Sequence, residues 1–96
     1  MKYAFHPEAL KEYQAAAAYY ASCQSQLGMR FIESIESAIQ QVVAAPNRWH
    51  RLEDDLRQFL VPVFPYVIIY SVETDSILIL LVMHSHREPG YWRNRV

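Results

Sequence analysis

The residue types best suited to chemistry gather in the last part of the chain. The segment reads His84-Ser85-His86-Arg87-Glu88-Pro89-Gly90-Tyr91-Trp92-Arg93-Asn94-Arg95. Imidazole, guanidinium, phenol and indole groups can bind phosphate, stack on nucleic-acid bases or anchor a protein partner. The apolar run before the segment, Ile77 to Met83, is typical of a buried strand. We therefore expect the functional residues to lie where this strand ends, near His84.

General acid–base cleavage of RNA is one chemistry that such residues support. The reaction needs two proton-transfer groups around the 2′-hydroxyl and the leaving oxygen. It also needs a cation that stabilises the charge developing on the phosphate. The residues available for a nuclease are Arg57, His84, Arg87 and Tyr91. They form a catalytic hypothesis, and we assign no catalytic residue beyond them.

Binding of a target or a partner is the other chemistry that the segment supports. Guanidinium groups make bidentate contacts with carboxylate and phosphate, and an indole beside them can stack on a base. For Trp92 the alternative is burial in the protein core, with the neighbouring arginines in solvent. The candidate target- or partner-binding residues are Arg57, His84, His86, Arg87, Tyr91, Trp92, Arg93 and Arg95.

A metal site is a further possibility that the sequence does not favour. His84 and His86 lie two positions apart, so their imidazoles point to the same side of an extended strand. A metal ion needs one or two more ligands within reach. Cys23 and His50 are distant in the sequence, and no predicted element brings them close. We predict no metal site and no cofactor.

Two other groupings have ordinary structural explanations. Tyr13, Tyr19 and Tyr20 resemble an aromatic recognition surface, but large aromatic side chains on a helix more often pack into the core. The acidic run Glu53 to Asp55 resembles a cation site, but a solvent-exposed loop explains it better. We predict core packing for the tyrosines and solvent exposure for the acidic run.

Length and composition limit the class of protein. The chain has 96 residues, which indicates one domain spanning residues 1–96, and 52% of them are hydrophobic, which excludes a disordered chain. Its single cysteine excludes an internal disulfide, and no apolar run has the length of a membrane helix or a signal sequence. We expect a cytoplasmic protein.

The charge of the chain bears on its partners. Its net charge is −1, and proteins that bind nucleic acid directly need a basic excess to neutralise phosphates. We therefore do not expect direct binding to nucleic acid or to a membrane surface.

The periodicity of apolar residues predicts an α+β fold. Helical spacing predicts an antiparallel helical hairpin, with Gly28 allowing the two helices to approach closely. Strand-like runs then predict a three-stranded antiparallel meander that packs on the hairpin, with the first strand beside the last in either direction. A polar loop is expected over Asn47 to Asp55. The expected elements are a strand over Lys2 to Phe5, helices over Pro7 to Ala21 and Gln26 to Ala45, and strands over Leu56 to Val61, Tyr66 to Val72 and Ile77 to His84.

The last two strands of the predicted meander are apolar at both odd and even positions. A strand with one face in water alternates between polar and apolar residues, and these strands do not. The helical hairpin covers one face of the sheet, so something else must cover the other. The candidates are Tyr91 and Trp92 of the C-terminal segment, a second copy of the chain, or a partner protein.

Four stretches of the sequence together resemble a known family. They are Phe5-His6-Pro7-Glu8-Ala9, Leu27-Gly28-Met29-Arg30-Phe31, Phe64-Pro65-Tyr66-Val67-Ile68-Ile69-Tyr70, and His84-x-His86-Arg87-x-Pro89-x-Tyr91-Trp92. In their order and spacing they resemble the RelE/ParE superfamily of toxins, also called plasmid stabilization proteins. The resemblance runs from Tyr3 to Arg95 and is closer to the ParE branch than to the RelE branch.

The resemblance implies a strand, two helices and three strands, which agrees with the fold predicted from periodicity. It also implies a toxin of a type II toxin–antitoxin module that is neutralised when a cognate antitoxin wraps its apolar surface. ParE-like members inhibit DNA gyrase, and RelE-like members cleave mRNA on the ribosome with basic residues on the central strands.

Three functional hypotheses follow from the resemblance. The central strands of this chain, Tyr66 to Val72 and Ile77 to Met83, carry no Lys or Arg, which favours a ParE-like inhibitor of an essential enzyme such as gyrase. The alternatives are a RelE-like ribosome-dependent endoribonuclease and a non-toxic remnant that only binds an antitoxin. A homodimer is compatible with each of them.

Overall fold

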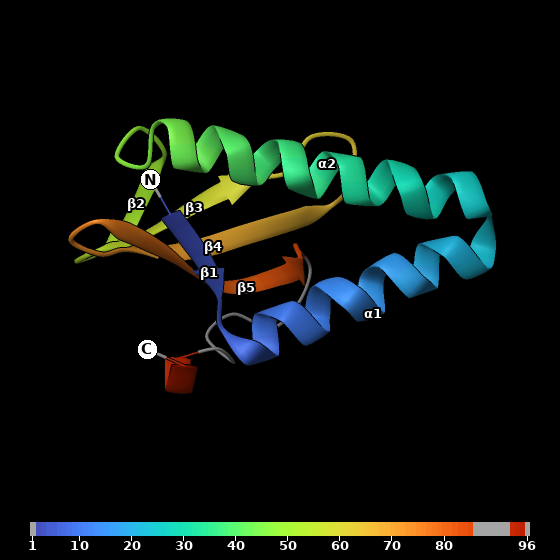
Figure 1. Ribbon diagram of the computed structural model, residues 1–96, viewed down its shortest axis with the longest axis horizontal. Coiled ribbons are helices and arrows are strands. Elements are labelled where there is room, and N and C mark those ends of the chain that lie inside the picture. Colours follow the sequence, from blue (N-terminus) through green and yellow to red (C-terminus); the bar gives the residue numbers. More distant parts are fainter. Residues whose placement is uncertain (1, 86–92, 96) are drawn as a thin grey trace.

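The computed structural model describes residues 2–85 and 93–95 and has an α+β fold (Figure 1). The chain begins with a strand, continues through two helices and returns as four more strands before a short terminal 3₁₀ turn. The elements are β1 (Lys2–Phe5), α1 (Pro7–Cys23), α2 (Ser25–Ala44), β2 (His50–Glu53), β3 (Leu56–Leu60), β4 (Tyr66–Val72), β5 (Ser76–His84) and η1 (Arg93–Arg95).

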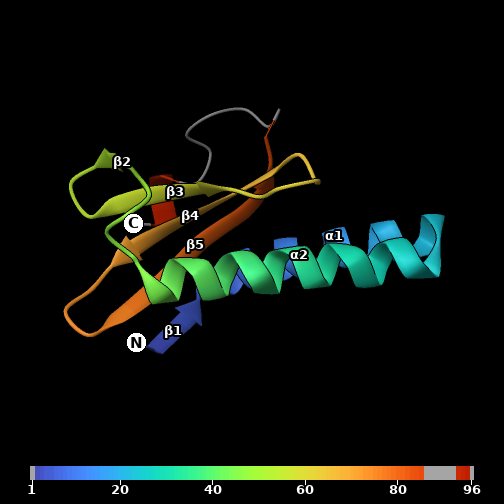
Figure 2. The ribbon, with the colours of Figure 1, turned by 90° about the horizontal axis from the view of Figure 1, so that it is seen from above.

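The strands form one sheet in the order β1-β5-β4-β3-β2. The two helices pack as an antiparallel hairpin on one face of this sheet, and their connecting turn extends beyond it (Figure 2). β1 pairs with β5 in parallel, and the other neighbours are antiparallel. The predicted fold class is confirmed, and β1 takes its expected place beside the last strand.

Local sequence explains where the helices begin and end. Pro7 occupies the first turn of α1, and the Nδ1 atom of His6 accepts a hydrogen bond from the backbone N–H of Glu8 at 3.1 Å. Gln24 has extended backbone angles between the helices, so the connection is one residue long. α2 ends at Ala44, because the residue before Pro46 is disfavoured in helical geometry.

Gly28 allows the two helices to come together at this short connection. A Cβ atom placed on Gly28 would lie 2.7 Å from the Cβ atom of Ala21, which is closer than carbon atoms pack. The predicted close approach of the helices at Gly28 is confirmed.

The main core lies between the helical hairpin and the sheet. Tyr20 and Phe31 of the hairpin meet Phe64 and Tyr66 of the sheet side, with ring centroids 4.9–6.2 Å apart. Tyr13 is also buried, and its hydroxyl donates a hydrogen bond to Glu36 at 2.8 Å. Tyr19 is exposed. The core packing predicted for these tyrosines therefore holds for Tyr13 and Tyr20 and is wrong for Tyr19.

The second face of the sheet is buried within the single chain. An irregularity in the pairing of β4 with β5 places Leu80 and Leu81 consecutively in one cluster on this face. Each is at most 1% exposed. Apolar residues on both faces of β5 therefore reflect two buried layers within one chain. The predicted cover by Tyr91 and Trp92 lies outside the described residues.

β2 is the element that the sequence analysis missed. It lies inside the predicted polar loop, pairs with β3 from His50 opposite Gln58, and exposes all four of its residues. Backbone hydrogen bonds to β3 form this edge strand, whose one apolar side chain, Leu52, is exposed, so no periodic pattern marked it. Asp54, with a φ of 44°, makes the tight turn into β3, and the acidic run is exposed as predicted. No helix among the described residues is long and apolar enough to cross a membrane.

Candidate functional site

A notch between α1 and the outer edge of β5 is the first candidate site. β1 pairs with β5 only as far as Ile79, so in the described part of the chain no strand pairs with β5 from Leu80 onward on its side away from β4. Small side chains of α1 leave a hollow of about 300 Å³ beside this edge. Its lining residues are Glu12, Ala15, Ala16, Tyr66, Val82, Met83 and His84.

His84 lies at the end of β5, where the sequence analysis expected it. It is opposite Tyr66 in the sheet, and the two rings meet edge to face with centroids 5.5 Å apart. Burial raises the pKa of the Tyr66 hydroxyl, and the nearby Tyr20 raises it further. Tyr66 therefore stays neutral at physiological pH and supports the imidazole as an aromatic surface.

Arg95 is not presented to solvent as a target-binding residue. Its guanidinium makes a bidentate ion pair with Glu12 of α1, with both N···O distances at 2.9 Å, and it also donates to the carbonyl of Leu80. Arg95 therefore joins η1 to α1 and β5, and its binding role stays a prediction.

Arg93 lies at the surface and forms an ion pair with Glu53 of β2. Its side chain is 62% exposed, so the pair is screened by water and stabilises the fold little. A target that offers a carboxylate or phosphate can compete with Glu53 for this guanidinium. The binding role of Arg93 stays a prediction.

Arg57 does not lie beside His84. Arg57 lies on β3 opposite Tyr70, and its Nη1 atom donates to the carbonyl oxygen of Trp49 at 2.9 Å. Since His84 is opposite Tyr66 on the same strand, the two residues are separated by about 13 Å of β4 at the usual strand rise. The buried side chain of Ile68 lies between these positions. The structure does not assemble these two members of the nuclease hypothesis into one site.

The remaining predicted residues of the C-terminal segment, His86, Arg87, Tyr91 and Trp92, lie outside the described residues.

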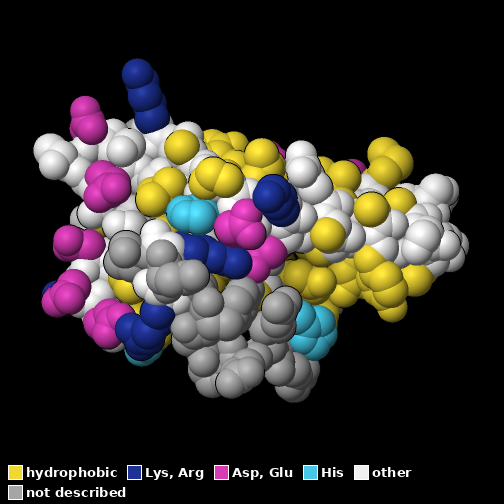
Figure 3. All heavy atoms as spheres, turned by 90° about the horizontal axis from the view of Figure 1, so that it is seen from below, with side chains coloured by type: hydrophobic (Ala, Val, Ile, Leu, Met, Phe, Trp, Pro, Cys, Tyr) yellow, Lys and Arg dark blue, Asp and Glu magenta, His cyan; other side chains and the backbone are white. Residues whose placement is uncertain are grey.

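The notch has the chemistry of a protein contact. In the described residues, its lining includes one carboxylate and no Lys or Arg. On the face shown in Figure 3, acidic and basic side chains lie side by side, and hydrophobic side chains extend toward the hairpin end. A phosphate backbone needs a continuous positive surface, and the described residues of this face do not offer one. No group of three or more potential metal ligands occurs among the described residues.

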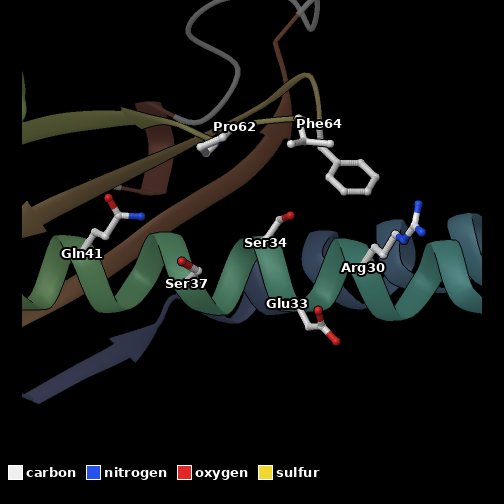
Figure 4. A pocket seen from close by; sticks show the side chains of 8 residues that line it. Arg30, Glu33, Ser34, Ser37, Gln41, Pro62 and Phe64 are labelled. Carbon is white, nitrogen blue, oxygen red and sulfur yellow. The ribbon is translucent and has the colours of Figure 1, made fainter.

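A second hollow, which the sequence analysis missed, runs between α2 and the loop that joins β3 to β4. Its volume is about 350 Å³, and Figure 4 shows Arg30, Ser34 and Gln41 of α2 on the side that faces the loop. Val63, in that loop, has a φ of 75° and a side chain that is 93% exposed. A β-branched residue rarely adopts such angles. The signal in the sequence was an apolar pair, Val63 and Phe64, between two prolines.

The chain matches the model of one protein family and is similar to solved structures. The family model of the ParE toxin of type II toxin–antitoxin systems, parDE, matches residues 3–89. A solved structure described as the chromosomal ParDE TA system from P. aeruginosa is similar, with a TM-score of 0.74 and 16% sequence identity. That match covers 88% of this chain and 95% of the other, and at this identity it establishes the fold alone. There is no match among curated proteins.

Proposed function

Because the chain belongs to the family of ParE toxins of type II toxin–antitoxin systems, we propose that it arrests the growth of the cell that makes it. In this proposal the chain binds and inhibits an essential enzyme, DNA gyrase, and a cognate antitoxin neutralises it. Both partners are cytoplasmic, so the chain acts in the cytoplasm.

The observation that carries the proposal is the family match over residues 3–89, which includes the helical hairpin, all of the sheet except Lys2 and the first residues of the C-terminal segment. The chemistry of the described residues supports an inhibitor rather than a nuclease. β4 and β5 contain no Lys or Arg, and Arg57 and His84 lie apart.

The antitoxin in this proposal binds the two hollows beside the hairpin. The notch offers the partly exposed side chains of Tyr66 and Met83, against which an antitoxin segment can pack. The hollow along α2 offers Val63 and Phe64 as apolar contacts for a second segment. In this proposal the exposed side chain of Arg93 acts on the target.

A double substitution, Arg87→Ala with Arg93→Ala, tests which residues act. We expect the variant to fold and to lose toxicity, because the side chain of Arg93 is exposed and its ion pair with Glu53 stabilises the fold little. The readouts are growth after induction and the circular dichroism of the purified variant. A folded variant that still arrests growth removes these arginines from the site.

The target is tested with purified protein and two parallel assays. In the first, gyrase supercoils relaxed plasmid DNA in the presence of increasing amounts of the chain, and we expect inhibition that the antitoxin reverses. In the second, the 5′ ends of cellular mRNA are mapped after induction. Cleavage of translated messages without inhibition of gyrase contradicts the proposal and supports the endoribonuclease alternative.

A further inference from the structure

Glu12 and Arg95 connect two distant parts of the chain. They lie 83 positions apart in the sequence, and Nη1 and Nη2 of Arg95 each donate to a different carboxylate oxygen of Glu12 at 2.9 Å. The side chains of Arg95 and Glu12 are only 11% and 19% exposed. A bidentate pair that is largely shielded from water is the strong form of this interaction.

The same two side chains also bind the edge of β5. Arg95 Nη1 donates to the carbonyl oxygen of Leu80 at 2.9 Å, and the backbone N–H of Val82 donates to Glu12 Oε1 at 3.3 Å. Both backbone groups lie beyond Ile79, the last residue of β5 that pairs with β1. The ion pair therefore forms hydrogen bonds with backbone groups at this edge, as a neighbouring strand does elsewhere in the sheet.

The other contact of the terminal turn is weaker. Arg93 pairs with Glu53 at the surface, where water screens the charges and such pairs stabilise little. Among the described contacts of η1, the bridge from Arg95 to Glu12 is therefore the one that fixes the chain end to α1 and β5.

We propose that Glu12 is a positioning residue for the terminal turn η1. Its bridge to Arg95 holds η1 against β5 and thereby places the exposed side chain of Arg93, and the toxic action depends on this anchor although Glu12 touches no target. The inference rests on the proposed function, because it assigns that action to Arg93.

Three variants and a matched control test the anchor in cells. Glu12→Gln keeps the shape of the side chain and removes its charge, Arg95→Glu places two carboxylates together, and the double variant Glu12→Arg with Arg95→Glu restores an ion pair in reverse. The control, Glu8→Gln, removes one charge from the same helix at an exposed pair with Lys11, where the side chains are 51% and 74% exposed.

We expect the wild-type chain and Glu8→Gln to arrest growth to the same extent. Glu12→Gln and Arg95→Glu lose the arrest. The reversed double variant regains part of it, because the ion pair can form again but a guanidinium at position 12 cannot accept the N–H of Val82. Such rescue does not follow if each substitution simply damages the fold.

Amide hydrogen exchange separates anchoring from general stability. In Glu12→Gln we expect faster exchange at Val82 and at residues 93–95 than in Glu8→Gln, with unchanged exchange in the core of α2. If Glu12→Gln fails to fold, Arg95→Lys replaces it, because Lys keeps the charge but cannot form the bidentate pair.

Two outcomes overturn the inference. One is a folded Glu12→Gln chain that arrests growth as strongly as the wild type. The other is equal exchange at residues 93–95 in Glu12→Gln and Glu8→Gln. A wild-type chain that leaves growth unchanged contradicts the proposed function instead, and the exchange measurement then decides the anchoring role by itself.

Discussion

At the scale of single residues, Tyr70 shows how a buried polar group is held. Its side chain is fully buried, and its hydroxyl donates to the carbonyl of Pro46 at 2.8 Å. Tyr70→Phe leaves that carbonyl without this donor, and we expect a loss of about 1–3 kcal/mol in the free energy of unfolding. Urea denaturation followed by circular dichroism measures it. The matched control is Tyr19→Phe at the exposed end of α1, which should change the stability little.

The same hydroxyl predicts how stability depends on alkaline pH. Burial raises the pKa of Tyr70 from 10.0 to about 12, although the nearby guanidinium of Arg57 opposes the rise. The unfolded chain then releases this proton at lower pH than the folded chain does. The contribution of the neutral Tyr70 hydroxyl to the free energy of unfolding is therefore complete below pH 10 and is lost as the pH rises toward 12.

The measurement is the urea midpoint of the wild type and of Tyr70→Phe between neutral pH and pH 12. We expect a smaller alkaline decline in Tyr70→Phe. Part of the decline remains, because burial also raises the pKa values of Tyr13 and Tyr66. Parallel declines in the two proteins would show that Tyr70 does not contribute.

Residue types predicted part of the candidate site. His84 could be placed at the end of a strand because seven apolar residues precede it. The roles of Arg57 and Arg95 could not be predicted, because their partners are a backbone carbonyl and a glutamate 83 positions away. Charge and residue type indicate what a side chain can bind, but only the fold determines which partner lies within bonding distance.

At the scale of elements, the helical hairpin depends on one glycine. Alanine normally favours a helix over glycine by about 1 kcal/mol. At position 28, however, a Cβ atom would lie 2.7 Å from Ala21 Cβ and 2.9 Å from Ala21 Cα, which is backbone and cannot rotate away. We expect Gly28→Ala to destabilise the fold by about 1–3 kcal/mol, because it overpacks the helix contact.

Thermal unfolding of Gly28→Ala tests this close contact. Ser37→Ala, at an exposed position of the same helix, is the control for helix propensity and should leave the midpoint almost unchanged. A Gly28→Ala protein as stable as the wild type would mean that the helices can move apart without cost.

The elements with strong periodicity were the ones that the sequence predicted well. Both helices and the strands β3, β4 and β5 lie within a few residues of their expected bounds. β2 was missed because its backbone, and not its side chains, joins it to the sheet. The double burial of β5 was predicted from its unbroken apolar run. The sequence did not determine whether the same chain covers the second face of β5, because a sequence does not say which chain supplies the cover.

At the scale of the whole molecule, the described surface fits a protein that binds proteins. A hairpin covers one face of the sheet, two hollows flank it, and the described residues that line the notch offer no cation for a phosphate. Because the proposed function depends on surfaces that a partner covers, antitoxin binding should protect these surfaces from amide hydrogen exchange. We expect the antitoxin to slow amide hydrogen exchange along β5 and to raise the thermal midpoint of the chain.

The control for this protection is β2, at the opposite edge of the sheet. Its exchange should change little when the antitoxin binds. Protection confined to β2, with β5 unchanged, would place the antitoxin on the wrong edge of the sheet for the proposed contact.

Growth after induction tests the central claim most directly. The chain is expressed alone in a bacterial host, and in parallel with the small protein encoded beside its gene as the antitoxin. We predict that the chain alone arrests growth and that the second protein restores it. Unimpaired growth in cells that contain the folded chain would contradict the assignment of a toxin.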